Sequence, residues 1–166
     1  MKRIDALRRF NPPNVKTLPT LEEPGKSQAV LPGVTWEENE FGYYGYKETF
    51  YPWPHGHGSV CLEQVRHLDR RDLGFLADEQ DINSGTLDRF LFLDTETTGL
   101  AGSSGTLAFL VGLGMATSEG FLIGQFFCPD YPQEAAVLGA VKEWLLSAEG
   151  IVTFNGRRFD WPLLKD

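Results

Sequence analysis

Two acidic residues stand two positions apart at the end of an apolar run. Asp94 and Glu96 follow residues 90–93, a continuous apolar stretch typical of a buried strand. Side chains at i and i+2 of a strand point to the same face, so both carboxylates should look into one space. Two like charges about 4 Å apart repel by about 4 kcal/mol at an effective dielectric near 20. Protonation, a basic partner or a divalent cation such as Mg²⁺ or Mn²⁺ would each offset this repulsion.

A third acidic residue follows a second apolar run. Asp160 comes shortly after residues 151–154 and a turn at Asn155-Gly156, and it is expected in the first turn of a helix. If the two apolar runs form parallel neighbouring strands, their carboxyl ends meet at one edge of the sheet, where ligands commonly bind. Asp160 would then converge with the first two acids. Relief of their mutual repulsion predicts that Asp94→Asn or Asp160→Asn spares or raises stability in metal-free buffer.

The elements around these acids follow the order β-β-β-α-β-α. The sequence predicts strands at 90–93, 107–113 and 121–127, then a helix, and then a strand at 151–154 that precedes the last helix. Asp130 and Pro132 are expected to start the first helix, and Gly150 to stop it. A helical crossover places the fourth strand parallel to the first. The fold class is therefore α/β with a mixed sheet.

The first half of the chain is less regular. Residues 1–33 form a proline-rich, poorly ordered lead-in, and 34–86 a small accessory β/α segment before the domain at 87–166. Within this accessory segment, the aromatic-rich residues 34–53 predict a β-hairpin. The aromatic rings of its stretch 41–51 either pack at a core or edge or stack bases. The set His55, His57 and Cys61 matches no established zinc spacing and is interpreted as a turn, with a zinc site as the alternative.

Two motifs resemble those of a known family. The stretch Phe92-Leu93-Asp94-Thr95-Glu96-Thr97-Thr98-Gly99-Leu100 is similar to the first motif of DEDD-type 3′–5′ exonucleases. The stretch Asn155-x-x-x-Phe159-Asp160 is similar to their second motif. Within the ribonuclease H-like superfamily, both runs look most like a bacterial branch of predicted exonucleases.

This resemblance implies a ribonuclease H-like fold and a metal-dependent 3′–5′ exonuclease with a two-metal mechanism. Asp94, Glu96 and Asp160 would be catalytic and would hold two Mg²⁺ or Mn²⁺ ions. The partner would be a single-stranded 3′ end of DNA or RNA. Its binding residues would be Thr97, Thr98, Leu100, Asn155 and Phe159, with Arg157 and Arg158 as phosphate-binding candidates.

The family's third motif, a fourth aspartate with a tyrosine or histidine, is not found before Asp166. The resemblance therefore implies a C-terminally truncated chain that lacks the last strand and helices.

Several alternatives stand beside this interpretation. A truncated domain could bind metal or nucleic acid without turnover. Asp94-x-Glu96-x-Thr98 loosely resembles the nucleophile motif of haloacid dehalogenase-type phosphatases, although glutamate replaces the second aspartate. The first motif is also compatible with an ordinary solvated turn, and Asp160 with a charge that complements a helix dipole. Arg157 and Arg158 are alternatively a solvated helix face.

Composition and charge limit the classes of function and the cellular compartment that the sequence allows. The net charge of −8 argues against a protein that holds nucleic acid by bulk charge alone. The 2 cysteines lack CxxC spacing, and the N-terminus has no apolar stretch behind its basic residues. The longest apolar run, residues 107–116, is broken by glycines and is too short to span a bilayer. These features predict a cytoplasmic protein with reduced thiols.

Overall fold

The computed structural model describes residues 31–77, 83–99 and 105–165. The first part contains four strands and two short helices: β1 (Thr35–Asn39), β2 (Gly42–Pro52), β3 (Gly56–His57), β4 (Val60–Cys61), the 3₁₀ helix η1 (Leu62–His67) and α2 (Arg70–Leu76). The rest contains β5 (Phe90–Thr97), β6 (Ala108–Ala116), β7 (Gly120–Phe127), η2 (Tyr131–Gln133), α3 (Glu134–Leu145), β8 (Gly150–Thr153) and α4 (Asp160–Lys165). None of the described helices combines the length and the apolar character needed to cross a bilayer.

Six of the strands form one mixed sheet with the order β1-β2-β7-β6-β5-β8. The strands β5, β6 and β7 run as an antiparallel meander, and β8 pairs in parallel with β5 after the α3 crossover. This arrangement confirms the predicted α/β mixed sheet and is consistent with a ribonuclease H-like fold. It differs from the doubly wound parallel sheet that the phosphatase alternative requires. The strands β3 and β4 form a separate two-stranded sheet.

The predicted aromatic hairpin forms and joins the main sheet. The strand β2 pairs with β1 on one side and with β7 on the other, from Gly45 opposite Phe127 to Pro52 opposite Gly120. The strands β1 and β2 therefore share their sheet with the second half of the chain, although the sequence assigns residues 34–86 to an accessory segment. The domain boundary near residue 86 stays a prediction. Most of the expected lead-in, residues 1–30, lies outside the described residues.

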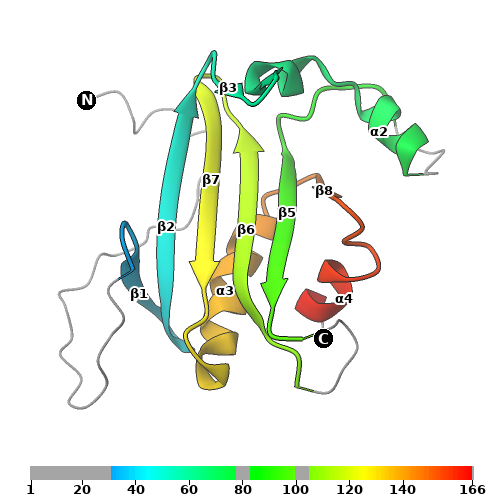
Figure 1. Ribbon diagram of the computed structural model, residues 1–166. Helices are drawn as coiled ribbons and strands as arrows, with labels where there is room; N and C mark the ends of the chain where they lie inside the picture. The colour runs from blue at the N-terminus through cyan, green and yellow to red at the C-terminus, as the bar shows by residue number, and fades with distance from the viewer. Residues whose placement is uncertain (1–30, 78–82, 100–104, 166) are drawn as a thin grey trace.

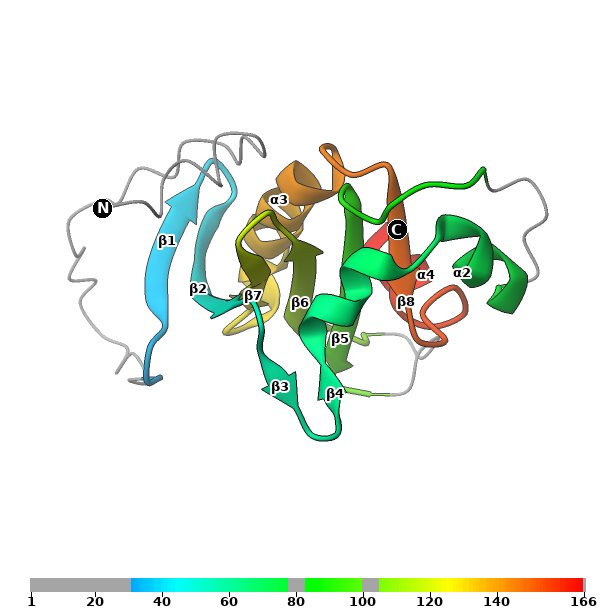
Figure 2. The ribbon, with the colours of Figure 1, turned by 90° about the horizontal axis from the view of Figure 1, so that it is seen from above.

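Helix α3 covers one face of the sheet because both surfaces present apolar side chains. Its buried residues are Ala136, Val137, Ala140, Val141 and Trp144, which recur at the spacing of one helix face. Along β7 the even-numbered residues are buried and the odd-numbered residues only half-buried. The odd-numbered residues lie on the face of the sheet opposite α3. Figure 1 looks onto this opposite face, with α3 behind the sheet, and Figure 2 shows α3 from above. We call the face that α3 leaves uncovered the open face.

The predicted cap at Asp130 is confirmed, with a 3₁₀ first turn, whereas the predicted stop at Gly150 is wrong. Asp130 caps η2 by accepting a hydrogen bond from the backbone N–H of Tyr131, so Pro132 lies in this 3₁₀ turn and α3 begins only at Glu134. Gly150 does not stop the helix but opens β8 opposite Phe90. A Cβ atom at Gly150 would lie 2.5 Å from the Phe90 ring. Glycine is therefore needed there for close packing of the two strands.

A set of contacts around Arg70 fixes the start of β5 and β8. The Arg70 guanidinium donates to the carbonyl of Thr86 at 2.6 Å and to the carboxylate of Glu149 at 2.7 Å. It also stacks 4.9 Å from the centroid of the Phe90 ring. Glu149 closes the connection through its backbone N–H, which donates to the carbonyl of Arg89 at 2.8 Å. The strand that carries Asp94 and Glu96 and the strand that precedes Asp160 are thus held at their N-terminal ends.

Candidate functional site

Strand β5 changes from core to surface along its length. Leu91 and Leu93 are 0% and 3% exposed, whereas Asp94 and Glu96 at its carboxyl end are both exposed. Leu93 lies on the face that α3 covers, so alternation places Asp94 and Glu96 on the open face. Their register agrees, since Asp94 pairs with Gly112 and Glu96 with Leu110. The two carboxylates share one face, as their spacing predicts.

The pair is available to a cation. Neither Asp94 nor Glu96 makes an ion pair with any residue that the structure describes. Their oxygens are the hard donors that Mg²⁺ and Mn²⁺ prefer, and no basic side chain competes for them in that part of the chain. The chemistry and placement of these two side chains therefore fit a divalent cation.

Asp160 is placed differently. Its carboxylate is 8% exposed and accepts a short hydrogen bond from the hydroxyl of Thr95. It also accepts from the hydroxyl of Thr153 at 3.4 Å. Thr95 alternates with the acidic pair along β5, and Thr153 pairs with Leu93, so both hydroxyls lie on the α3 side of the sheet. The structure thus places Asp160 on the opposite side of β5 from Asp94 and Glu96.

This placement separates the three predicted ligands. Among residues 31–77, 83–99 and 105–165, no three His, Cys, Asp or Glu side chains come close enough to hold a metal ion together. In its present position Asp160 does not fit a cation shared with the pair, because its oxygens are engaged by two threonines. Its role as a third metal ligand stays a prediction.

The turn between β8 and α4 produces this position of Asp160. Asn155 adopts a left-handed backbone conformation with φ of 59°, which asparagine tolerates better than most residues. Gly156 is buried, and a Cβ atom there would lie 2.5 Å from Oδ2 of Asp160 and would also collide with the Thr153 hydroxyl. The backbone N–H of Trp161 donates to the carbonyl of Gly156 at 2.8 Å. Glycine at 156 is therefore required for the carboxylate to reach the two hydroxyls.

The last two threonines of the first motif, Thr97 and Thr98, have structural partners. The Thr97 hydroxyl donates to the carbonyl of Gly99 at 2.6 Å. Thr98 accepts from the backbone N–H of Leu107 at 3.0 Å through its hydroxyl, and its own N–H donates back to the Leu107 carbonyl at 3.0 Å. These bonds close the loop between β5 and β6. Leu100 lies outside the described residues, and substrate contacts by all three residues stay predictions.

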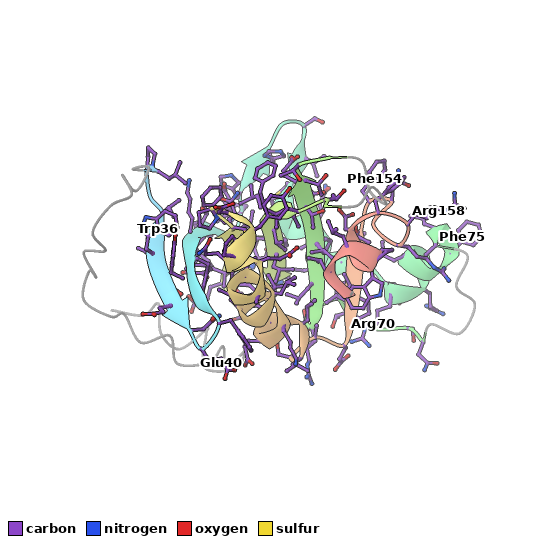
Figure 3. All side chains as sticks on the ribbon, turned by 90° about the horizontal axis from the view of Figure 1, so that it is seen from below. Trp36, Glu40, Arg70, Phe75, Phe154 and Arg158 are labelled. Atoms are coloured by element: carbon purple, nitrogen blue, oxygen red, sulfur yellow. The ribbon has the colours of Figure 1, made fainter. Side chains whose placement is uncertain are left out.

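The second motif presents exposed side chains at the β8 edge of the sheet. Asn155 is exposed and Phe159 is 53% exposed. The neighbouring Phe154 is 88% exposed, and Arg157 and Arg158 are also exposed. Figure 3 shows Phe154 and Arg158 beyond this edge, at the opposite end of the molecule from Trp36 on β1. A role for these side chains in substrate binding stays a prediction.

The other candidates from the first half lie in or beside small strands. The ring of His55 packs 4.5 Å from the ring of Tyr51, while His57 and Cys61 belong to the β3–β4 pair. In β2, alternate aromatic side chains take different faces. Tyr44 lies in the core under α3 and Tyr46 packs against it, whereas Tyr43 faces the other way and contacts Trp36.

Sequence reasoning missed Thr95, Thr153 and Gly156, which together determine the position of Asp160. One signal was available: Thr95 must face the covered side because it lies between two acids on the open side. A hydroxyl at the edge of a core needs an acceptor. Nothing in the sequence identified Asp160 as that acceptor.

Two comparisons with known proteins bear on this site. Residues 91–166 match the family model RNase_H_2, described as RNase_H superfamily, so the matched segment includes all three acidic residues. The chain is also 28% identical over 123 residues to a protein of Bacillus subtilis (strain 168) named Uncharacterized protein YprB. That alignment covers 72% of this chain and 29% of the relative, so the chain spans less than a third of the relative's length.

Proposed function

We propose that this chain carries the metal-binding carboxylate pair of a nuclease that hydrolyses phosphodiester bonds in nucleic acid. The match of residues 91–166 to the RNase_H superfamily supports this class, because ribonuclease H-like domains are generally nucleases that use divalent metal ions. It favours a nuclease over the phosphatase and the non-catalytic fragment. The finer proposal, a 3′–5′ exonuclease on single-stranded DNA or RNA, rests on the resemblance of the two motifs.

One observation carries the proposal. Asp94 and Glu96 lie exposed on one face at the carboxyl end of an interior strand, without an ion-pair partner in the described residues. A strand end that displays two unpaired carboxylates side by side has an electrostatic cost that a bound cation removes. Gly112, directly opposite Asp94, leaves the neighbouring position without a side chain.

The chain's own residues would hold the cation and position the substrate. Asp94 and Glu96 would bind Mg²⁺ or Mn²⁺, which supplies an activated water and offsets charge on the leaving oxygen. Thr95, between them, is fixed by its hydrogen bond to Asp160, so it restrains the backbone that carries both carboxylates. Thr97 and Thr98 hold the loop after β5 and thereby restrain the same strand end.

The direct test combines metal binding with hydrolysis. The purified chain is titrated with Mn²⁺, with free Mn²⁺ followed by electron paramagnetic resonance, and is then incubated with Mn²⁺ and a 5′-labelled single-stranded oligonucleotide. We expect Mn²⁺ binding and a ladder that shortens from the 3′ end. Asp94→Asn and Glu96→Gln should each weaken Mn²⁺ binding at least tenfold and lower the rate at least a hundredfold.

A charge-matched control excludes a general effect of lost negative charge. Glu143 is exposed on α3, behind the sheet, so Glu143→Gln should leave both Mn²⁺ affinity and rate unchanged. Mn²⁺ binding that survives in Asp94→Asn and Glu96→Gln would refute the proposed ligands. Metal binding without hydrolysis would reduce the function of this chain to a cation-binding domain.

A further inference from the structure

The acidic pair does not stand alone on the open face. Strand register connects Asp94 to Gly112 on β6, Gly112 to Gln125 on β7, and Gln125 to Lys47 on β2. Because residues paired across strands share a face, this row runs from a carboxylate to an ammonium group across four strands. Among the strand positions of this face that the structure describes, Lys47 is the basic residue. The row therefore has opposite charges at its two ends.

A neighbouring row ends in aromatic rings. Register connects Glu96 to Leu110, Leu110 to Phe127, and Phe127 through Gly45 to Trp36 on the edge strand β1. The Trp36 ring lies 6.2 Å from that of Phe127 and 5.9 Å from that of Tyr43, in edge-to-face orientations. All three rings are only half-buried. We call Trp36, Tyr43 and Phe127 the aromatic cluster.

Gly112 lies between the acidic pair and the aromatic cluster, and as a glycine it projects no side chain from the open face. Gly114, two residues on, has a packing reason to be glycine, since a Cβ atom there would lie 2.7 Å from the Phe121 ring. Among the residues that the structure describes, a Cβ atom at Gly112 would meet only the backbone oxygen of Asp94, at an ordinary 3.7 Å. Glycine in a strand interior weakens the strand, and it often marks close approach of a ligand. Packing among the described residues does not explain a glycine at position 112.

We propose that single-stranded nucleic acid lies across the open face, with its bases on the aromatic cluster, its backbone near Lys47 and its end passing Gly112 to the acidic pair. This inference rests on the proposed nuclease function and names the substrate path for that site. Aromatic side chains on an exposed sheet can stack bases of any sequence, and a basic group beside them fits the phosphate backbone. The opposite face is closed to such a ligand by α3.

The geometry sets a length for the ligand. Neighbouring strands are about 4.8 Å apart, so β5 and β2 are separated by about 14 Å and β5 and β1 by about 19 Å. Stacked nucleotides advance by about 3.4 Å each. A strand that reaches from the acidic pair to the aromatic cluster therefore contains about four to six nucleotides. Shorter oligonucleotides reach only one of the two.

Binding is measured without metal, so that no hydrolysis occurs. Fluorescence anisotropy in EDTA at low salt follows 5′-fluorescein oligothymidylates and oligouridylates of 3, 6 and 12 nucleotides. We expect affinity to rise at least tenfold from 3 to 6 nucleotides and less than threefold from 6 to 12. Oligouridylate that binds while oligothymidylate does not would assign RNA as the substrate, and the reverse would assign DNA.

The sharpest variant is Gly112→Val, because a Cβ atom at this position makes only an ordinary contact with the described residues and the new side chain would stand in the proposed path. We expect thermal stability equal to or above that of the wild type, since valine favours strands, and affinity for the 6-mer reduced at least tenfold. Gly56→Val is the matched control: Gly56 lies in β3, outside the main sheet, and a Cβ atom there meets no described atom within 4 Å. It should leave binding unchanged.

Two further pairs test the ends of the path. Lys47→Gln should weaken binding and reduce its salt dependence, whereas Lys142→Gln, on exposed α3, should do neither. Trp36→Ala should weaken binding at least fivefold, whereas Phe75→Ala, an 85% exposed aromatic residue on α2, should not. If Trp36→Ala unfolds, Gly112→Val and Lys47→Gln still decide the question.

The failure of this inference can be told from the failure of the proposed function. Wild-type affinity in both Gly112→Val and Lys47→Gln would overturn the path, even if the wild type degrades nucleic acid. Binding that depends on these residues would support the path, even if Mn²⁺ produces no hydrolysis. No binding of any oligonucleotide by the wild type, at concentrations up to the millimolar range, would also overturn it.

Discussion

The contact between Thr95 and Asp160 gives the most decisive prediction for the site. Asp160 is 8% exposed and its carboxylate accepts from two hydroxyls, those of Thr95 and Thr153. Hydrogen bonds to a charged group contribute about 1.5–3 kcal/mol, and a buried hydroxyl left without a partner costs about 1–3 kcal/mol. We therefore expect Asp160→Ala to lower the free energy of unfolding by about 2–4 kcal/mol, and Thr95→Val by about 1.5–3 kcal/mol.

A double-mutant cycle isolates the contact from other effects of each substitution. Urea unfolding of the wild type, Thr95→Val, Asp160→Ala and the double variant is followed by tryptophan fluorescence at pH 7 in EDTA. The coupling free energy should be about 1.5–3 kcal/mol, because the double variant loses the same hydrogen bond only once. Thr95→Val combined with Glu143→Gln, which lies on α3, should be additive.

An Asp160→Ala variant that keeps its stability would instead favour the arrangement predicted from sequence, in which Asp160 lies beside Asp94 and Glu96. Clustering with Asp94 and Glu96 predicts that removal of the Asp160 charge spares or raises stability in metal-free buffer. A coupling below about 0.5 kcal/mol, together with a stable Asp160→Ala variant, would refute the contact and the placement of α4 that depends on it.

Three further predictions concern charge and close packing. Asp94 and Glu96 are both exposed, and positions i and i+2 of a strand lie about 7 Å apart, not the about 4 Å assumed from sequence. Asp94→Asn should therefore raise the free energy of unfolding by up to about 0.6 kcal/mol at low ionic strength, the repulsion of two charges at this distance in water. The gain should vanish in 1 M salt or with Mn²⁺. Gly156→Ala should lower it by about 1–3 kcal/mol, because the new Cβ atom would lie 2.5 Å from a carboxylate oxygen of Asp160. Burial raises the pKa of Glu37 above 4.5. The folded state therefore binds this proton more tightly, and its stability falls as pH rises from 4.5 through the folded-state pKa. Glu37→Gln should for that reason stabilise the protein at pH 7 relative to the wild type, with a smaller difference at pH 4, as measured by urea unfolding at each pH.

Each of these has its own control or contrary outcome. Salt-independent stabilisation by Asp94→Asn would mean that charge repulsion is not the cause. Gly56→Ala, where a Cβ atom meets nothing within 4 Å in the described part of the chain, should change stability by less than about 0.5 kcal/mol. A Glu37→Gln effect that is equal at both pH values would point to the hydrogen bond from the Tyr44 hydroxyl, 3.0 Å away, and not to the charge.

The second half of the fold could be read from the sequence because its signals are local. Apolar runs predicted β5, β6 and β7, and an apolar repeat at three and four residues predicted α3. The crossover rule predicted that β8 pairs in parallel with β5. The pairing of β2 with β7 was not predicted. The sequence of an aromatic hairpin indicates that its edge strand needs a partner, but it does not indicate which distant strand is that partner.

The candidate site also has one part that the sequence predicted and one part that it did not. The shared face of Asp94 and Glu96 follows from strand alternation alone. The position of Asp160 depends on the path of the turn before it, where Asn155 takes φ of 59° and the helix begins only at residue 160. Backbone conformation in a turn decides toward which face the next side chain points, and residue spacing does not encode that choice.

The pairing of β2 with β7 has a consequence during synthesis. Gly45 and Phe127 lie opposite each other although 82 residues separate them in the chain. Translation at about 5–20 residues per second delivers the partner strand about 4–16 s after the hairpin. Throughout that interval an aromatic strand has an unpaired edge that other nascent chains can bind. Slower elongation lengthens this exposure, so yield of folded protein should depend on translation rate and on chaperones that shield the hairpin.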